Sequence, residues 1–395
     1  MTEPSPPAGA RQKRIWNDPR VRAAVFQAVA LGAVLWFGWS LFSNTLSNME
    51  SRGINTGFGF LDQPAGFGII MSLIPYDETM SYGRTFWVGL LNTLLVSGLG
   101  IVLATILGFV IGIARLSRNW LVAKIALAYI EIFRNIPLLL QIFFWYFAVL
   151  RSVPSPRQSL SLGDLFFLNN RGFYMPRPEF LDGSGVVLIA LIVAVLAVIG
   201  VKIWATRRQD ATGKLFPVFW TSLALLIVLP GIAFVAAGLP LDWNMPALKG
   251  FNFGGGIVIT PELAALLVAL TIYTAAFIAE TVRSGILSVS HGQTEAAEAL
   301  GLRNGVILRR VVIPQAMRVI VPPLTSQYLN LIKNSSLATA IGYPDLVAVF
   351  MGTTLNQTGQ AVEIVAMTMA VYLVISLVIS LLMNIYNRTV ALEER

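Results

Sequence analysis

The sequence has no cysteine and only one histidine, His291, among its 395 residues. The lack of cysteine excludes disulfides, thiol catalysis and thiolate metal sites, although it does not identify the compartment. One histidine leaves too few side chains for a histidine-rich zinc site, and the sequence offers no convincing Ser-His-Asp triad. We therefore expect no metal site, no cofactor bound by this chain and no catalytic centre of these kinds.

Charged residues are also scarce. They make up 12% of the chain, whereas 56% of the residues are hydrophobic and the mean hydropathy is +0.72. Soluble domains contain about 25% charged residues. Water is therefore not the main solvent of this chain, and the repeated apolar runs predict an all-α, polytopic helical membrane protein.

About eight segments have the length that a bilayer requires, since a core about 30 Å thick needs roughly 20 apolar residues per helix. The first run is too long for the core of a signal peptide and has no small-residue cleavage site, so we expect a retained helix. The predicted spans are 23–42, 86–114, 125–150, 186–203, 215–239, 257–279, 319–341 and 364–386.

The basic residues indicate the orientation of these spans. With eight crossings, 19 lysines and arginines fall on the side of the two termini and 7 on the opposite side. Such a bias is typical of bacterial inner-membrane proteins, whose cytoplasmic segments are the more basic. We expect a multi-pass protein of the bacterial inner membrane with both termini in the cytoplasm. The same bias explains the net charge of +8 without a nucleic-acid partner.

The chain divides into four predicted parts. Residues 1–85 hold an N-terminal tail, the first span and an outer loop, and residues 86–150 hold two spans joined by a short basic turn. Residues 151–256 resemble an insertion of two spans flanked by outer loops rich in proline and glycine. Residues 257–395 hold three spans and a long cytoplasmic loop.

That cytoplasmic loop carries the most specific local pattern. Ser290 and Gln293 have capping-box spacing, which predicts the start of a helix. Glu295 and Glu298 suit the positive N-terminal half of such a helix, and Gly301 suits a left-handed stop. Alanines give the helix a slim face that could insert into a groove on a cytoplasmic partner. The alternative is a surface amphipathic helix without a partner.

The loop resembles the EAA loop of ABC importer permeases. The matching stretches are Glu295-Ala296-Ala297, Gly301 and Val311-Val312-Ile313-Pro314. The resemblance implies that the helix over residues 290–301 docks on a separate ATPase subunit and couples ATP hydrolysis to transport. The residues assigned to this coupling are Glu295, Ala296, Ala297, Gly301, Arg303 and Pro314.

Further stretches resemble the polar amino-acid permeases within that family. Examples are Glu131-Ile132-Phe133-Arg134-Asn135-Ile136-Pro137 and Lys333-Asn334-Ser335-Ser336-Leu337. The resemblance implies a type I ABC importer permease core of five helices plus about three extra spans. The extra parts resemble the Q-type subunit of general L-amino-acid transporters or the related glutamate/glutamine/aspartate/asparagine permease.

The resemblance also implies partners. They are a second, homologous permease subunit in a pseudo-two-fold heterodimer, two copies of a cytoplasmic ATP-binding subunit and a periplasmic amino-acid-binding protein. ATP and Mg²⁺ would bind to the ATPase partner. This sequence itself has no P-loop motif, so we expect it not to be an enzyme.

Several polar residues lie within the predicted spans, where an isolated charge costs about 2.5–3.5 kcal/mol on insertion scales. Glu131 and Arg134 share a helix face, so they could line the translocation path or form an internal ion pair. Pro137 should kink the same span. Gln141 and Asn92 are lesser candidates for the lining of the path.

The sequence Lys333-Asn334-Ser335-Ser336 lies deep in the seventh span. Its ammonium, amide and hydroxyl groups could bind the α-carboxylate of an amino acid. Alternatively, the amide and hydroxyls could join helices by hydrogen bonds, with Lys333 paired to Glu131 or Glu280. The sequence leaves both interpretations open.

The main rival class is a secondary transporter or channel for small polar solutes, which needs no ATPase. Such a protein would favour inverted repeats, and the sequence shows none. A membrane-embedded enzyme would need acid, base or metal groups that converge near one face of the bilayer. The few intramembrane charges are too scattered for that, so the permease interpretation is preferred.

Overall fold

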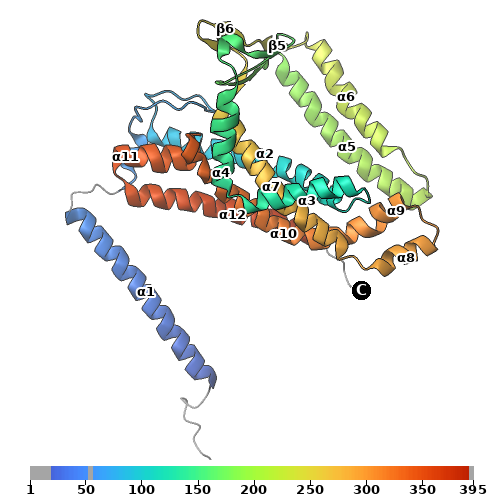
Figure 1. Cartoon of the computed structure of the whole chain (residues 1–395), viewed down its shortest axis with the longest axis horizontal. Coiled ribbons are helices and arrows are strands. Elements are labelled where there is room, and N and C mark those ends of the chain that lie inside the picture. Colours follow the sequence, from blue (N-terminus) through green and yellow to red (C-terminus); the bar gives the residue numbers. More distant parts are fainter. Residues whose placement is uncertain (1–18, 52–56, 391–395) are drawn as a thin grey trace, which may run out of the picture.

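The computed structural model describes residues 19–51 and 57–390, which leaves the predicted tail at 1–18 and the residues 391–395 outside it. Most of the described residues are helical, which confirms the all-α class (Figure 1). The α-helices are α1 Pro19–Ser51, α2 Tyr82–Arg115, α3 Trp120–Asn135, α4 Leu138–Phe143, α5 Ser184–Thr212, α6 Val218–Ala236, α7 Pro261–Leu287, α8 His291–Ala299, α9 Asn304–Ile307, α10 Ile313–Asn334, α11 Leu355–Thr358 and α12 Ala361–Val390.

Short helical segments of other types connect some of these helices. The 3-10 segments are Gly59–Asp62, Leu150–Ser152, Pro156–Gln158 and Ser335–Ile341, and the π-helical segments are Phe144–Val149, Leu308–Val312 and Val347–Thr354.

Six described helices are long and apolar enough to cross a membrane, namely α1, α2, α5, α6, α7 and α12. Each corresponds to a predicted span. The predicted span 319–341 corresponds to α10 and the 3-10 turn that follows it. Polar residues keep α10 less apolar than those six helices.

The third predicted span, 125–150, is not one continuous helix. It is broken between α3 and α4, and the two halves bend by 105°. Pro137 lies at the break, so the kink expected there is confirmed and is larger than a bend within a continuous helix. A proline lacks the N–H that the carbonyl four residues earlier would accept, which interrupts the helix at this point.

Eight short strands, which the sequence analysis did not anticipate, occupy the loops around the two insertion helices. They are β1 Leu160–Leu162, β2 Phe166–Asn169, β3 Gly172–Met175, β4 Arg177–Phe180, β5 Leu241–Asn244, β6 Ala247–Lys249, β7 Asn252–Gly254 and β8 Ile257–Ile259. They form an antiparallel sheet in the order β1-β2-β3-β8 and the pairs β4-β5 and β6-β7. Residues 257–259 therefore form a strand, not the start of the predicted span 257–279.

Helices α2 and α7 form the most extensive helix pair of the core. Their close approach depends on two glycines of α2 that lie four residues apart, a spacing that lets membrane helices pack tightly. A Cβ atom on Gly108 would lie 2.6 Å from Ile278 Cβ, and one on Gly112 would lie 2.7 Å from the carbonyl oxygen of Ala279. The two backbones are thus in direct contact along α7.

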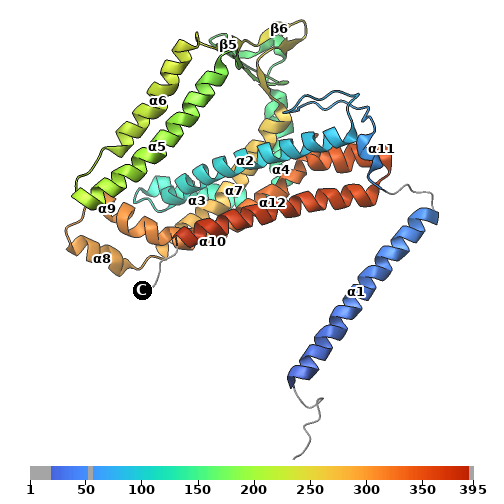
Figure 2. The ribbon, with the colours of Figure 1, turned by 180° about the vertical axis from the view of Figure 1, so that it is seen from behind.

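The elements divide between two ends of the molecule (Figure 1). Helices α8 and α9 lie at one end, together with the α5–α6 turn and the C-terminal end of α2. The strands and residues 57–81 lie toward the other. Helix α1 stands apart from the other helices in both views (Figures 1 and 2), and none of its most apolar window is buried.

Candidate functional site

The predicted coupling helix is present as α8, which follows α7 after a short turn and precedes α9. Its N-cap is Ser290, as the spacing predicts, but the Ser290 hydroxyl forms no capping hydrogen bond. The backbone carbonyl of Ser290 accepts instead from Gln293 N at 3.0 Å. His291 Nδ1 lies 2.8 Å from Glu295 Oε1, and this pair spans the first turn of the helix.

The end of α8 confirms the predicted left-handed stop. Gly301 has φ +71°, which favours a residue without a Cβ atom. Gly301 N donates to Glu298 O at 2.8 Å, and Leu302 N donates back to Ala297 O at 3.2 Å. These bonds satisfy carbonyls at the helix end and fix a sharp turn into α9.

One face of α8 lies against the protein and the other is open. Ala297 is buried, whereas Glu295, Ala296 and Glu298 are exposed. Arg303 is the N-cap of α9, and Pro314 lies at the start of α10, directly after the π-helical segment Leu308–Val312. The segment is therefore a short, exposed helix attached at both ends to core helices, α7 and α10.

A second group of predicted residues lies where α10 ends. The helix stops at Asn334, and the backbone continues as a 3-10 turn. Ser335 Oγ donates to Ile332 O at 2.7 Å, and Ser336 Oγ donates to Lys333 O at 2.6 Å. Both hydroxyls therefore donate to carbonyls of their own turn. Among the described residues, exposed Lys333 has no ion-pair partner, so the suggested pairs with Glu131 and Glu280 are not formed.

A polar cavity of about 290 Å³ lies between α7 and α10, and its lining includes Asn334 but not Lys333. The α10 side contributes three amide side chains, and the α7 side contributes a threonine and two aromatic rings. We call this surface the α7–α10 polar face; its lining residues are Tyr273, Thr274, Phe277, Gln327, Asn330 and Asn334.

Sequence reasoning identified Asn334 but missed Gln327 and Asn330. The missed signal is their spacing, because residues 327, 330 and 334 follow the i, i+3, i+7 pattern of one helix face. An amide stripe within a membrane helix is expected to face protein or water. The stripe therefore marks the side of α10 that does not face lipid.

Glu131 and Arg134 do not form the ion pair that their spacing allows. The Arg134 guanidinium lies over the Phe277 ring, 5.2 Å from its centroid, and Glu131 Oε2 accepts from Asn135 Nδ2 at 3.4 Å. Glu280 pairs with Arg283 Nε at 3.1 Å. Arg134 is thus brought to the edge of the α7–α10 polar face through Phe277.

Gln141 is buried and donates hydrogen bonds to backbone carbonyls at the break between α3 and α4. Its Nε2 donates to Phe133 O at 3.1 Å and to Ile136 O at 3.0 Å. Phe133 O is the acceptor that would receive a helical N–H from residue 137, which is Pro137. The Gln141 amide replaces that missing donor.

Asn92 is also buried, and its Nδ2 donates to Met71 O at 2.9 Å and to Pro344 O at 2.8 Å. Tyr343 OH donates to Asn92 O at 3.0 Å. These bonds hold the loop after Ile341 against α2. The structure thus places Asn92 and Gln141 among backbone contacts, away from the lining of the α7–α10 polar face.

Comparison with known proteins identifies the family. Residues 211–392 match the family of binding-protein-dependent transport system inner membrane components. YhdX of Escherichia coli K12 is 59% identical over 96% of each chain. The general L-amino acid transport system permease protein AapQ of Rhizobium johnstonii is 51% identical over 96% of this chain and 94% of AapQ.

A third relative is BztB of Rhodobacter capsulatus, the glutamate/glutamine/aspartate/asparagine transport system permease protein, which is 44% identical over 99% of this chain and 98% of BztB. A solved amino acid ABC transporter has 20% identity and a TM-score of 0.46, over 78% of this chain and 95% of that one. A permease subunit of this kind is not itself the ATPase. The chain belongs to the permease subunits of binding-protein-dependent amino-acid ABC importers.

Proposed function

We propose that this permease moves polar L-amino acids inward across the bacterial inner membrane and that a separate ATPase drives it through α8. The names of two relatives, AapQ and BztB, support this cargo class. The partners in this proposal are a second permease subunit, two copies of a cytoplasmic ATP-binding subunit and a periplasmic amino-acid-binding protein. Both termini lie in the cytoplasm, as the basic residues indicate.

The observation that carries the coupling role is the attachment of α8. It is a two-turn helix with an open acidic face, joined to α7 on one side and, through α9, to α10 on the other. A force on α8 therefore acts on the two helices that line the polar face. This arrangement supports transmission of ATP-driven closure from the partner to the path.

The α7–α10 polar face is the proposed wall of the translocation path. Its amides can exchange hydrogen bonds with a zwitterionic cargo, and the Lys333 ammonium can pair with a carboxylate. Arg134 adds a second positive group near the same face. A second permease subunit across the pseudo-two-fold axis would supply the opposite wall.

Glu295→Lys tests the coupling role. We expect ATP-driven amino-acid uptake in proteoliposomes to fall about tenfold or more, because reversing a charge at a docking surface costs binding energy. Asp210→Lys is the matched control, since Asp210 is an exposed acid at the end of α5 on the same side of the molecule. Equal uptake by the Glu295→Lys variant and the parent would contradict docking through α8.

Lys333→Ala tests the path. Losing a charge-assisted hydrogen bond worth about 1.5–3 kcal/mol should raise the amino-acid concentration for half-maximal ATPase stimulation about tenfold or more. Lys202→Ala, an exposed lysine near the end of α5, should leave it unchanged. If Lys333→Ala leaves this concentration unchanged, Lys333 does not bind the cargo. Uptake by the permease alone, without ATPase and nucleotide, would instead favour a secondary transporter.

A further inference from the structure

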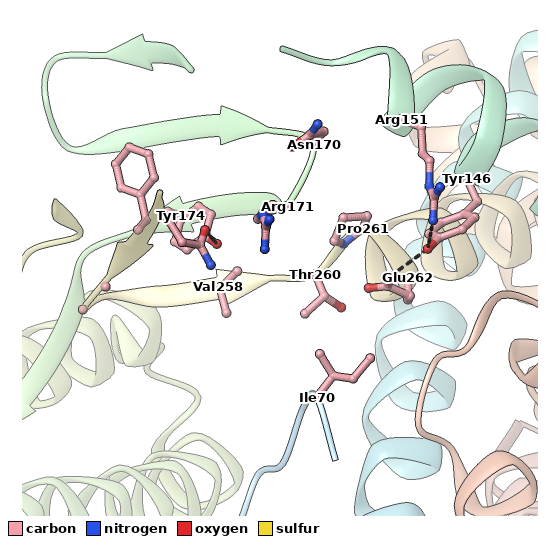
Figure 3. Close-up of a pocket in the computed structure, with 14 residues that line it drawn as sticks. Ile70, Tyr146, Arg151, Asn170, Arg171, Tyr174, Val258, Thr260, Pro261 and Glu262 are labelled. Carbon is pink, nitrogen blue, oxygen red and sulfur yellow. Dashed lines mark hydrogen bonds between the residues drawn. The ribbon is translucent and has the colours of Figure 1, made fainter. Parts of the chain in front are cut away.

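A larger polar cavity lies at the strand-bearing end of the molecule, where α7 begins. It has a volume of about 710 Å³ and opens between the β2–β3 turn, the start of α7 and the π-helical segment after α4 (Figure 3). We call it the outer basin. The residues used below to define it are Ile70, Tyr146, Arg151, Arg171, Tyr174 and Glu262.

One wall of the outer basin is a fixed chain of polar contacts. Tyr146 OH donates to Glu262 Oε1 at 2.9 Å, and Arg151 Nη2 donates to the same hydroxyl at 3.4 Å (Figure 3). Glu262 lies in the first turn of α7, where the helix dipole favours a negative charge. Buried Tyr146 thus holds a carboxylate in place at the wall of the basin.

The other wall comes from the insertion. Asn169 Oδ1 accepts from Arg171 N at 2.9 Å, which fixes the turn between β2 and β3. Tyr174 OH donates to Asn252 Oδ1 at 3.2 Å and holds the sheet against residues 252–254. The guanidinium of Arg171 is exposed and has no hydrogen-bond or ion-pair partner among the residues that the structure describes.

We propose that the outer basin binds a free acidic α-amino acid, as a receiving site ahead of the α7–α10 polar face. Arg171 binds one carboxylate, Arg151 faces the other, and Glu262 binds the α-ammonium group. Two cations and one anion give this lining a net charge of +1, which matches an amino acid of net charge −1. Arginine suits a carboxylate because its planar fork forms two parallel hydrogen bonds.

The size and position of the outer basin support a small ligand. Its volume lies within the range of about 300–1,000 Å³ typical of small-molecule sites, so an amino acid fits together with water. Its lining draws on three separated parts of the chain, the loop at Ile70, the insertion and the core. The choice of an amino acid as ligand rests on the proposed function.

The absence of cysteine from the chain makes a direct test simple. The Ile70→Cys variant places one thiol on the rim, since Ile70 lines the basin and is 74% exposed. The assembled transporter in nanodiscs, without binding protein or nucleotide, is labelled with a membrane-impermeant maleimide. We expect saturating L-glutamate to slow labelling at least about fivefold. Phe58→Cys, an exposed position outside the basin lining, should show no protection.

Substitutions in the Ile70→Cys background then test the ligand contacts. Arg171→Ala should raise the L-glutamate concentration that gives half-maximal protection of the thiol from labelling about tenfold or more. Arg177→Ala is the matched control, because Arg177 lies on β4, outside the basin lining, and pairs with Glu179. Glu262→Gln should weaken protection by L-glutamate but not by glutarate, which lacks the ammonium group.

The outcomes separate this site from the proposed function. Absence of protection, equal protection in the Arg171→Ala variant, or protection only when a binding protein docks would each overturn the receiving site, even if uptake persists. Failure of ATP-driven amino-acid uptake, with L-glutamate protection that depends on Arg171, would overturn the proposed function and leave the site in place.

Discussion

Helices of the core and helices of the insertion are similarly apolar but differ in how much of their surface is buried inside the protein. In the most apolar 18-residue window of α7, 61% of the residues are buried inside the protein, whereas in α6 none are. The corresponding share is 28% in α2 and 6% in α5. All four are apolar enough to span a membrane, so apolar content alone does not decide which helices form the core.

The difference lies in small and polar residues. Lipid tails are as apolar as leucine, so membrane helices pack through close backbone approach and interhelical hydrogen bonds. Helices α2 and α7 provide close approach at Gly108 and Gly112, next to Ile278 and Ala279. Helices α5 and α6 pack chiefly against each other, and most of their large apolar side chains remain exposed. The core helices therefore pack against several neighbours, whereas the two insertion helices pack chiefly as one hairpin.

The strongest test of this contrast is Gln141→Leu in the core against Gln209→Leu in the insertion. The core substitution leaves Phe133 O and Ile136 O without their side-chain donor. An unsatisfied buried group costs about 1–3 kcal/mol. Two carbonyls lose a donor and the unpartnered Gln141 Oε1 is removed, so the expected net loss is about 1–3 kcal/mol. Gln209 is exposed near the end of α5, and its substitution should cost little. Thermal unfolding of the purified transporter measures both, and equal melting temperatures would refute the role assigned to Gln141.

An effect of similar size is expected from one added methyl group. Gly112→Ala brings a Cβ atom to 2.7 Å from the Ala279 carbonyl oxygen, a backbone atom that cannot rotate away. Overpacking of this kind costs about 1–3 kcal/mol. Gly200→Ala in α5 has no atom within 4 Å of the new Cβ and should be neutral or slightly stabilising. Opposite shifts in melting temperature are the expected result, and a tolerated Gly112→Ala would show that the α2–α7 contact is loose.

The sequence predicts what depends on local chemistry. Apolar length located the helices, Pro137 located the break, and Gly301 located the end of α8. Each of these features determines the backbone conformation of residues close to it in the sequence. The family followed from the motif around Glu295, which has a fixed spacing along the chain.

What the sequence did not predict depends on contacts between distant segments. Strand β3 pairs with β8, which brings Phe173 opposite Ile259, and such short strands lack a strong periodic signal. The suggested partners of Lys333 were wrong because distances between helices are not encoded in spacing along one helix. The amide stripe at Gln327 and Asn330 was readable from periodicity, but its partner surface on α7 was not.

The smallest expected effect comes from removing the insertion hairpin altogether. Phe180 pairs with Leu241 in the β4–β5 ladder, and a Cβ atom on Gly183 would lie 3.4 Å from Ala237 O. The two ends of the hairpin therefore meet, and Gly183 can be joined to Gly238 with loss of α5 and α6. The strands and the outer basin remain in this variant.

Because α5 and α6 pack chiefly against each other, we expect the shortened chain to assemble with its partners and to melt within about 1 °C of the parent, which corresponds to about 1 kcal/mol for a chain of this length. Protection of the Ile70→Cys thiol by L-glutamate should also persist, since Arg171 and Glu262 lie outside the deleted segment. Collapse of the core after this deletion, in the same assay that detects Gln141→Leu, would show that the exposed hairpin supports the core. In that case the low burial of α5 and α6 would not mean that the core is independent of them.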